Sequence, residues 1–145
     1  MRVQETTFMK EFIRMCEDVW KLGWHECHAG NLSYRLTEKE RKEIEKDLDF
    51  SGAWIPSEVK VKQLAEELIF VTGSGKTFRN TPLKPEVETG IVEMNAEGTA
   101  YRIVWGFEDG GHPTSEFPTH LINLAIKKEY TDGRQRVVYH AHPEN

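Results

Sequence analysis

Hydrophobic residues near the start of the chain recur every three or four positions, with charged residues between them. This spacing predicts an amphipathic helix with one buried face, which Gly23 ends as its C-terminal cap. Thr37 and Glu40 form a capping-box pattern, which predicts a short, charged surface helix as far as Leu48. The buried stripe of the first helix consists of Phe8, Phe12, Met15, Val19 and Leu22.

A continuous apolar run over residues 68–72 predicts a buried strand. The segments 89–94 and 99–105 are rich in β-branched and aromatic residues, and the turn between them predicts a hairpin. Similar patterns predict strands over 32–36 and 136–142. A further helix is predicted over residues 116–130, with an apolar face made by Phe117, Leu121, Leu124 and Ala125.

The last predicted strand carries His140 and His142 two positions apart. Side chains at i and i+2 leave the same face of a strand, so both imidazoles can reach one metal ion of the kind zinc represents. Two ordinary half-buried histidines would give the same pattern. A catalytic zinc site normally has three protein ligands, so a third ligand would have to come from elsewhere.

A second group of potential metal ligands, His25, Cys27 and His28, lies in a short polar segment. The three residues are crowded together and have no matching cluster elsewhere in the sequence. This arrangement favours a solvated loop over a metal site.

The strand over 68–72 runs into Gly73-Ser74-Gly75-Lys76. A nucleotide-binding P-loop needs glycine where Phe70 stands, so the spacing excludes that motif. Two interpretations stay open, a tight glycine turn and a nest of backbone N–H groups for a small phosphate. Gly30 and Asn31, just before another strand, similarly offer close backbone approach and an amide donor for an anion.

Thr114, Ser115 and Glu116 stand at the start of the helix predicted over 116–130. They can act simply as an N-cap followed by an acidic first-turn residue that complements the helix dipole. A helix N-terminus also binds anions, and a carboxylate there can serve as a general acid or base. The two interpretations are compatible.

The length of 145 residues predicts one domain over 1–145, and 30% charged with 38% hydrophobic residues is typical of a globular protein. A net charge of -5 without a basic stripe argues against nucleic-acid binding. No apolar run reaches the roughly 20 residues that a membrane helix needs. Two cysteines, Cys16 and Cys27, are too few for a disulfide scaffold, so a reduced cytoplasmic location is expected.

Four motifs occur in one order along the chain, and together they closely resemble the class II aldolase/adducin family of zinc-dependent sugar-phosphate aldolases. The likeness covers nearly the whole chain and is weakest over residues 37–66. Each motif alone is weak evidence, but four in register are strong. They are Gly30-Asn31-Leu32-Ser33, Thr72-Gly73-Ser74-Gly75-Lys76, Thr114-Ser115-Glu116 and His140-Ala141-His142.

The resemblance implies a role for each of these motifs. Glu116 would be the general acid/base, and His140 and His142 would be two of the three ligands of a Zn(2+) ion. The family cleaves a ketose phosphate to dihydroxyacetone phosphate and an aldehyde, with zinc stabilising the enediolate. The phosphate of this small-molecule partner would be held by Gly30, Asn31, Ser74, Gly75 and Ser115.

The implied fold is α/β, a three-layer α/β/α arrangement around a mixed, largely antiparallel central sheet. The family's third histidine lies beyond Asn145, which predicts a domain truncated at its C-terminal side that binds zinc weakly and is inactive alone. Assembly as a homo-oligomer, a tetramer, is also implied, without nucleic-acid or membrane partners.

Two alternatives remain open on these residues. One is another enzyme of the same fold, such as a fuculose-phosphate aldolase or a pentulose-phosphate 4-epimerase, with a different substrate pocket. The other is a non-catalytic, adducin-like assembly module. Retention of both histidines and of Glu116 argues against the second.

Overall fold

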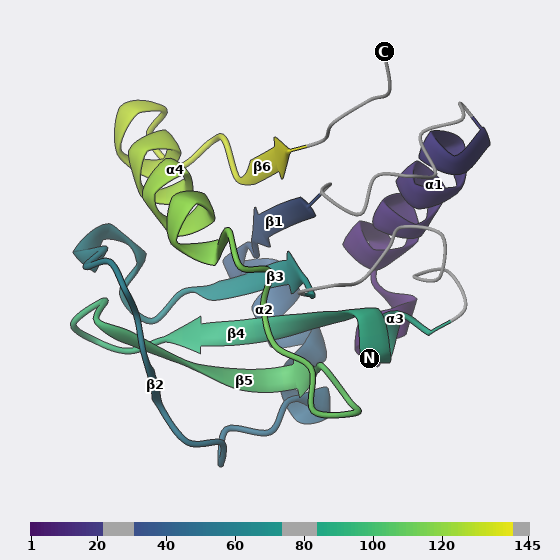
Figure 1. Cartoon of the computed structure of the whole chain (residues 1–145), viewed down its shortest axis with the longest axis horizontal. Helices are drawn as coiled ribbons and strands as arrows, with labels where there is room; N and C mark the ends of the chain where they lie inside the picture. The colour runs from purple at the N-terminus through teal and green to yellow at the C-terminus, as the bar shows by residue number, and fades with distance from the viewer. Residues whose placement is uncertain (22–30, 74–83, 141–145) are drawn as a thin grey trace.

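The computed structural model describes residues 1–21, 31–73 and 84–140 of the chain. Its centre is a sheet in which the described strands follow the order β2-β5-β4-β3-β1-β6 (Figure 1). Every pairing between these strands is antiparallel. The strands are β1 (Asn31–Arg35), β2 (Ile55–Pro56), β3 (Leu68–Thr72), β4 (Thr89–Met94), β5 (Ala100–Gly106) and β6 (Val137–His140).

The predicted strands agree closely with the structure. The predictions over 68–72 and 89–94 coincide with β3 and β4, and β1 and β5 differ by one residue at each end. β6 begins one residue after its predicted start, and the remainder of the prediction, 141–142, lies outside the described residues.

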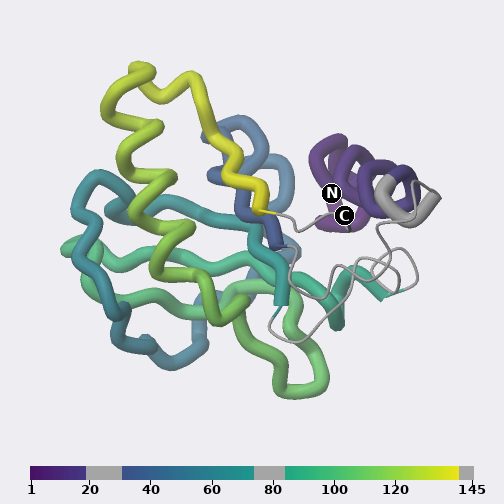
Figure 2. The backbone as a smooth tube through the Cα atoms, turned by 45° about the horizontal axis from the view of Figure 1, so that its top comes forward, coloured from purple at the N-terminus to yellow at the C-terminus, as the bar shows by residue number. Residues whose placement is uncertain are grey.

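Helices cover both faces of the sheet, as the three-layer prediction requires. Figure 2 shows α1 and α4 on opposite sides of the strands. The helices are α1 (Thr7–Lys21), α2 (Glu38–Ile44), α3 (Pro85–Glu88) and α4 (Phe117–Tyr130), with 3-10 turns η1 (Val3–Glu5), η2 (Glu45–Asp47) and η3 (Lys62–Leu64). No helix in the described part of the chain is both long and apolar enough to span a membrane.

The side chains of β3 explain why two cores form. Leu68 and Phe70 point to the face that α1 and α2 cover, whereas Ile69 and Val71 point to the face that α4 covers. All are buried, because the strand is sandwiched between both helix layers. A strand buried on both faces has a continuous apolar sequence rather than an alternating one, which is why this strand is easy to predict.

The capping box before α2 is present, since the Glu40 backbone N–H donates to Thr37 Oγ1 and the Thr37 backbone N–H donates to Glu40 Oε1. The prediction of a charged surface helix that buries little is confirmed, since Ile44 is the buried residue of α2 and the other positions of that helix are exposed or half-buried. Ile44 is fully buried in the same core as α1, and Leu48 packs against that core.

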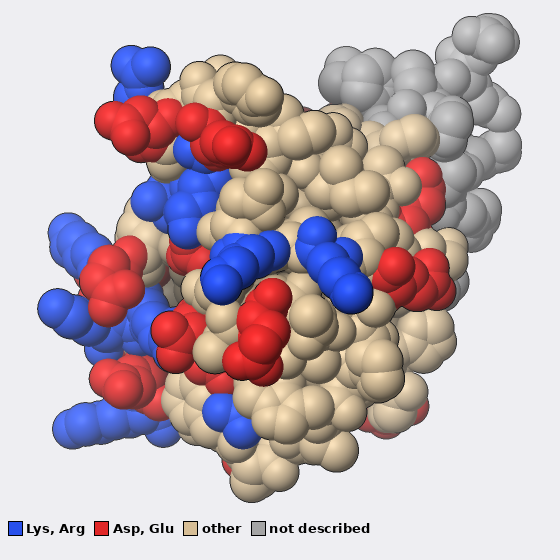
Figure 3. All heavy atoms as spheres, turned by 90° about the vertical axis from the view of Figure 1, so that its left-hand side faces the viewer, with Lys and Arg blue, Asp and Glu red and all other residues tan. Residues whose placement is uncertain are grey.

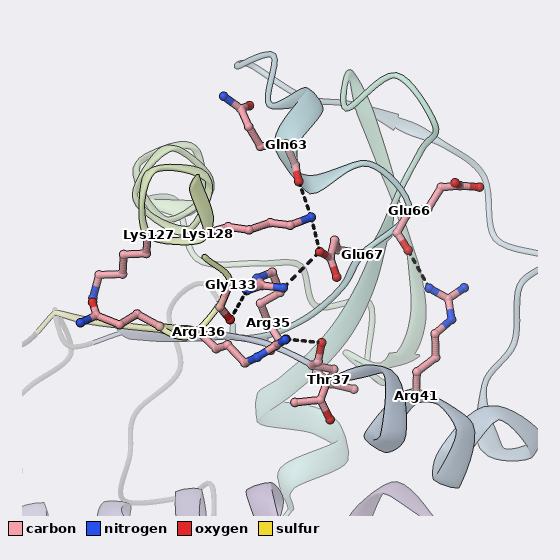
Figure 4. A network of polar contacts seen from close by, with 12 residues as sticks. Arg35, Thr37, Arg41, Gln63, Glu66, Glu67, Lys127, Lys128, Gly133 and Arg136 are labelled. Atoms are coloured by element: carbon pink, nitrogen blue, oxygen red, sulfur yellow. Dashed lines mark hydrogen bonds and ion pairs between the residues drawn. The ribbon is translucent and has the colours of Figure 1, made fainter. Parts of the chain in front are cut away.

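A buried charge network joins β1 to α4 at the end of the sheet opposite to residue 31 (Figure 4). The Arg35 side chain is 3% exposed and donates to Glu67 Oε2 at 3.1 Å and to the Gly133 carbonyl at 2.9 Å. Lys128 of α4 contacts the same Glu67 oxygen at 2.6 Å and donates to the Gln63 carbonyl. Burial lowers the pKa of the Arg35 guanidinium, and the Glu67 carboxylate opposes that shift.

Outside this network the charges are mixed. On the face drawn in Figure 3, acidic and basic side chains are interspersed, without a patch of one sign. The arrangement therefore gives this face no field that would attract a polyanion.

Replacing Glu67 by Gln should destabilise the fold, because the buried Arg35 charge loses its carboxylate partner. We expect a loss of roughly 2 kcal/mol in the free energy of unfolding. Glu66→Gln is the matched control, since the Glu66 side chain is exposed and should change stability by less than about 0.5 kcal/mol. Urea unfolding of the two variants tests this, and equal losses would contradict it.

Candidate active site

Antiparallel pairing brings three predicted site segments to one end of the sheet. Asn31 is the first residue of β1 and lies opposite His140, the last residue of β6. On the other edge of β1, the Leu32 backbone N–H donates to Thr72 Oγ1, at the end of β3. The start of β1 therefore lies between the ends of two strands that are far away in sequence.

The start of α4 is joined to the same place. The Thr114 backbone N–H donates to the Thr72 carbonyl at 2.9 Å, and Gly73 forms an isolated bridge with Pro113. These bonds hold the segment before α4 against the end of β3. As a result, Glu116 lies over the first residue of β1.

Three of the predicted site residues meet here. Asn31 Nδ2 donates to Glu116 Oε2 at 2.5 Å, and His140 Nδ1 lies 3.9 Å from Glu116 Oε1. Asn31 is 3% exposed, whereas the side chains of Glu116 and His140 are 39% and 41% exposed. The amide is thus part of the interior, and the carboxylate and the imidazole face solvent, where a ligand can reach them.

The cap of α4 differs from the sequence prediction. Glu116 is itself the N-cap residue rather than a first-turn residue, and its side chain makes no capping bond. Thr114 and Phe117 close a turn ahead of the helix, with the Phe117 N–H donating to the Thr114 carbonyl at 2.9 Å. Pro118 lies in the first turn of α4, where its missing N–H costs no intrahelical hydrogen bond. Instead of capping the helix, the Glu116 carboxylate accepts from Asn31 Nδ2.

Ser115 is exposed. It borders a surface pocket together with Tyr101 and Pro118, and Asn31, Glu116 and His140 do not line that pocket. Its proposed phosphate contact stays a prediction. Several other residues singled out from the sequence lie outside the described residues: His25, Cys27, His28, Gly30, Ser74, Gly75 and His142.

Sequence reasoning missed His120, which lies directly behind the cluster. Its Nε2 bonds to Asn31 Oδ1, and its Nδ1 is 2.6 Å from Ser33 Oγ. The ring is 2% exposed. One signal could have revealed it: His120 falls on the apolar stripe of α4 between Phe117 and Leu124, and a polar side chain there must find a partner.

Burial lowers the pKa of His120 to about 4, and His140 adds to that effect while Glu116 opposes it. The imidazole is therefore neutral at neutral pH, with one N–H donor and one acceptor nitrogen. Because the oxygen of the Asn31 amide can only accept, the proton of His120 is on Nε2. Nδ1 then accepts from the Ser33 hydroxyl.

Within residues 1–21, 31–73 and 84–140, no three His, Cys, Asp or Glu side chains converge to hold a metal ion. The side chains of His140 and Glu116 form a half-exposed pair at the surface of the candidate site. The described part of the site thus consists of a carboxylate, an imidazole and a buried amide, an arrangement suited to acid–base chemistry on a bound ligand.

Comparison with known proteins agrees with this architecture. The model of the class II aldolase and adducin N-terminal domain matches residues 10–145. The chain therefore belongs to the class II aldolase and adducin family. A solved structure, the sugar-phosphate aldolase from Thermotoga maritima, superposes with a TM-score of 0.73 at 26% identity, over 94% of this chain and 55% of that one.

The similar curated proteins include rhamnulose-1-phosphate aldolases. That of Listeria monocytogenes serovar 1/2a is 37% identical over 140 residues, which is 97% of this chain and 50% of the relative. That of Klebsiella pneumoniae subsp. pneumoniae is 35% identical over 138 residues, again 50% of the relative. The chain spans about half the length of these curated relatives.

The buried His120 should make folding stability depend on pH. A histidine with a lower pKa in the folded chain binds fewer protons there than in the unfolded chain, so its contribution is complete above pH 6.5 and is lost as the pH falls toward 4. The loss is at most about 1.4 kcal/mol per pH unit. Urea unfolding between pH 7 and pH 5 measures it, with His120→Gln as a variant that cannot titrate. Identical slopes for both proteins would contradict the prediction.

Proposed function

We propose that this chain supplies part of the active site of a lyase that cleaves L-rhamnulose 1-phosphate to dihydroxyacetone phosphate and L-lactaldehyde, a step of rhamnose degradation. The observation that carries the proposal is the meeting of Asn31, Glu116 and His140 at one end of the sheet. Family membership and the relatives' names support the substrate class.

Glu116 is the proposed general acid/base. Cleavage of the C3–C4 bond requires removal of the C4 hydroxyl proton, and the carbon fragment that keeps the bonding electrons must then be protonated. A half-exposed carboxylate can reach both positions in turn. Asn31 holds Oε2 of Glu116 at 2.5 Å, which leaves Oε1, on the side of His140, to exchange the proton.

His140 and His142 are the proposed zinc ligands. His140 fits this role, because its half-exposed imidazole lies at the end of β6 beside a carboxylate, and imidazole nitrogen is a preferred zinc donor. When bound, Zn(2+) would act as a Lewis acid for the negative charge that develops on the substrate oxygens. A third ligand stays a prediction of the family resemblance.

The substrate phosphate is assigned to Gly30, Asn31, Ser74, Gly75 and Ser115, as the family resemblance implies. The structure adds a constraint on Asn31, since its amide already donates to Glu116. A side-chain amide carries two N–H donors, so Asn31 would have to serve the carboxylate and the phosphate together. Such a residue would couple phosphate binding to the position of the acid/base. Assembly as a homotetramer stays a prediction.

Replacing Glu116 by Gln, in the protein expressed from its complete reading frame, tests the acid/base role. Gln keeps an acceptor for Asn31 but cannot exchange a proton, so kcat should fall by roughly 10²–10⁴. Binding of an enediolate mimic such as phosphoglycolohydroxamate should be nearly unchanged. Glu108→Gln, in an exposed loop, is the control. A Glu116→Gln variant that releases L-lactaldehyde at the wild-type rate would refute the assignment.

The same assay separates the alternatives. An epimerase would interconvert C4 epimers without releasing the aldehyde, and an adducin-like module would do neither. Another aldolase of this fold would release an aldehyde from a different ketose phosphate and leave L-rhamnulose 1-phosphate intact.

Replacing His140 by Gln, in the protein expressed from its complete reading frame, should reduce zinc affinity, because one imidazole donor is lost. We expect a loss of 10–100-fold or more, which is the range seen when even an outer partner of a metal site is removed. His112→Gln, at an exposed histidine, is the matched control. Metal analysis after dialysis measures the zinc content, and retention of stoichiometric zinc by His140→Gln would refute the ligand assignment.

A further inference from the structure

We propose that His120 is a positioning residue: by bonding to the carbonyl oxygen of the Asn31 side-chain amide, it holds the amide with its N–H directed at Glu116. In its catalytic consequence this inference rests on the function proposed above. The orientation itself can be tested without any assay of activity.

The orientation follows from the donors and acceptors along one chain of hydrogen bonds. Asn31 Nδ2 donates to Glu116 Oε2, so its Oδ1 faces Nε2 of His120, and Nδ1 of the ring faces Ser33 Oγ. Because Oδ1 can only accept, this arrangement requires Nε2 to donate and Nδ1 to accept from the Ser33 hydroxyl. Every donor in this chain meets an acceptor. If the amide were reversed, its oxygen would face the carboxylate oxygen, and two acceptors would repel each other.

Because these three residues are buried, their hydrogen bonds are the main constraint on the orientation of the Asn31 amide. Ser33 is 0% exposed, His120 2% and Asn31 3%, so water cannot easily replace a missing partner. A buried polar group without its hydrogen bond costs about 1–3 kcal/mol. The Glu116 carboxylate, which can only accept, selects the N–H end of the Asn31 amide, and His120 holds the other end of the amide in place.

The three residues come from rigid elements, which keeps the alignment precise. Asn31 and Ser33 are two positions apart on β1, so their side chains leave the same face of the strand. His120 approaches that face from the first turn of α4, one turn after Glu116. A single imidazole thus spans two strand positions and fixes the helix start against the strand at the same time.

A purely structural role is the competing explanation, in which His120 only joins α4 to β1. Two substitutions separate the explanations, because each preserves one half of the ring's bonding. The amide of Gln reaches about as far as Nε2 and can still donate to Asn31, whereas the shorter Asn reaches about as far as Nδ1 and can still bond to Ser33. Both variants lose one hydrogen bond and some packing.

Under the proposal, His120→Gln keeps kcat within a few-fold of wild type. His120→Asn lowers kcat by roughly 10–100-fold, by analogy with the loss of a hydrogen-bond partner that orients a metal ligand, with a smaller change in KM. Equal kcat values for the two variants, measured on the protein from its complete reading frame, would overturn the positioning role. If the wild type shows no cleavage of L-rhamnulose 1-phosphate, the proposed function fails, and the spectroscopic test below still decides the orientation.

The spectroscopic test uses NMR of the nitrogen-labelled protein. The ring nitrogens of His120 should show the neutral form protonated at Nε2. The side-chain N–H signals of Asn31 should move in Glu116→Gln and in His120→Asn, and much less in His120→Gln. The proposal would be overturned if the ring were protonated at Nδ1. It would also be overturned if the Asn31 signals kept their chemical shifts in both Glu116→Gln and His120→Asn.

Discussion

The pairing of β1 on both of its edges is the constraint on which the candidate site depends. Because β3 and β6 each run antiparallel to β1, their last residues lie beside its first. Residues from three distant parts of the sequence therefore meet at one corner of the sheet. The loop before α4 is bonded to the end of β3, and this bond sets the position of Glu116, which comes two residues later in the chain. Neither the carboxylate nor the imidazole would be placed without these two strand pairings.

The strands and the helices were readable from the sequence because each has a strong local pattern. β3 is continuously apolar and β4 is fully buried, and both were located to the residue. The helix over 116–130 was predicted from its apolar stripe, and its start was misplaced by one residue because a turn at Thr114 precedes it. Local patterns fix elements well and their ends less well.

The site was predictable only in part, for a different reason. Asn31, Glu116 and His140 were singled out from motifs, and the structure brings those three together. His120 was missed because its partners are 87 and 89 residues away along the chain. A periodic pattern records which face of a helix is buried, but it does not record which polar groups lie on the opposing strand. The partners of a buried histidine are a property of tertiary structure.

The two faces of β1 suggest how α4 is held in register. Leu32 and Tyr34 face the core beneath α1, whereas Asn31, Ser33 and Arg35 alternate with them and are buried on the other face. The polar residues are bonded to the start of α4, to His120 within it, and to Gly133 just after its end.

Apolar contacts alone tolerate small displacements of a helix, whereas hydrogen bonds weaken steeply with distance and angle. Sliding α4 by one residue, about 1.5 Å, would break bonds at both ends of β1 and leave buried groups unpaired. The ladder of polar contacts thus sets the position of α4 along the strand, and with it the position of Glu116 at the rim.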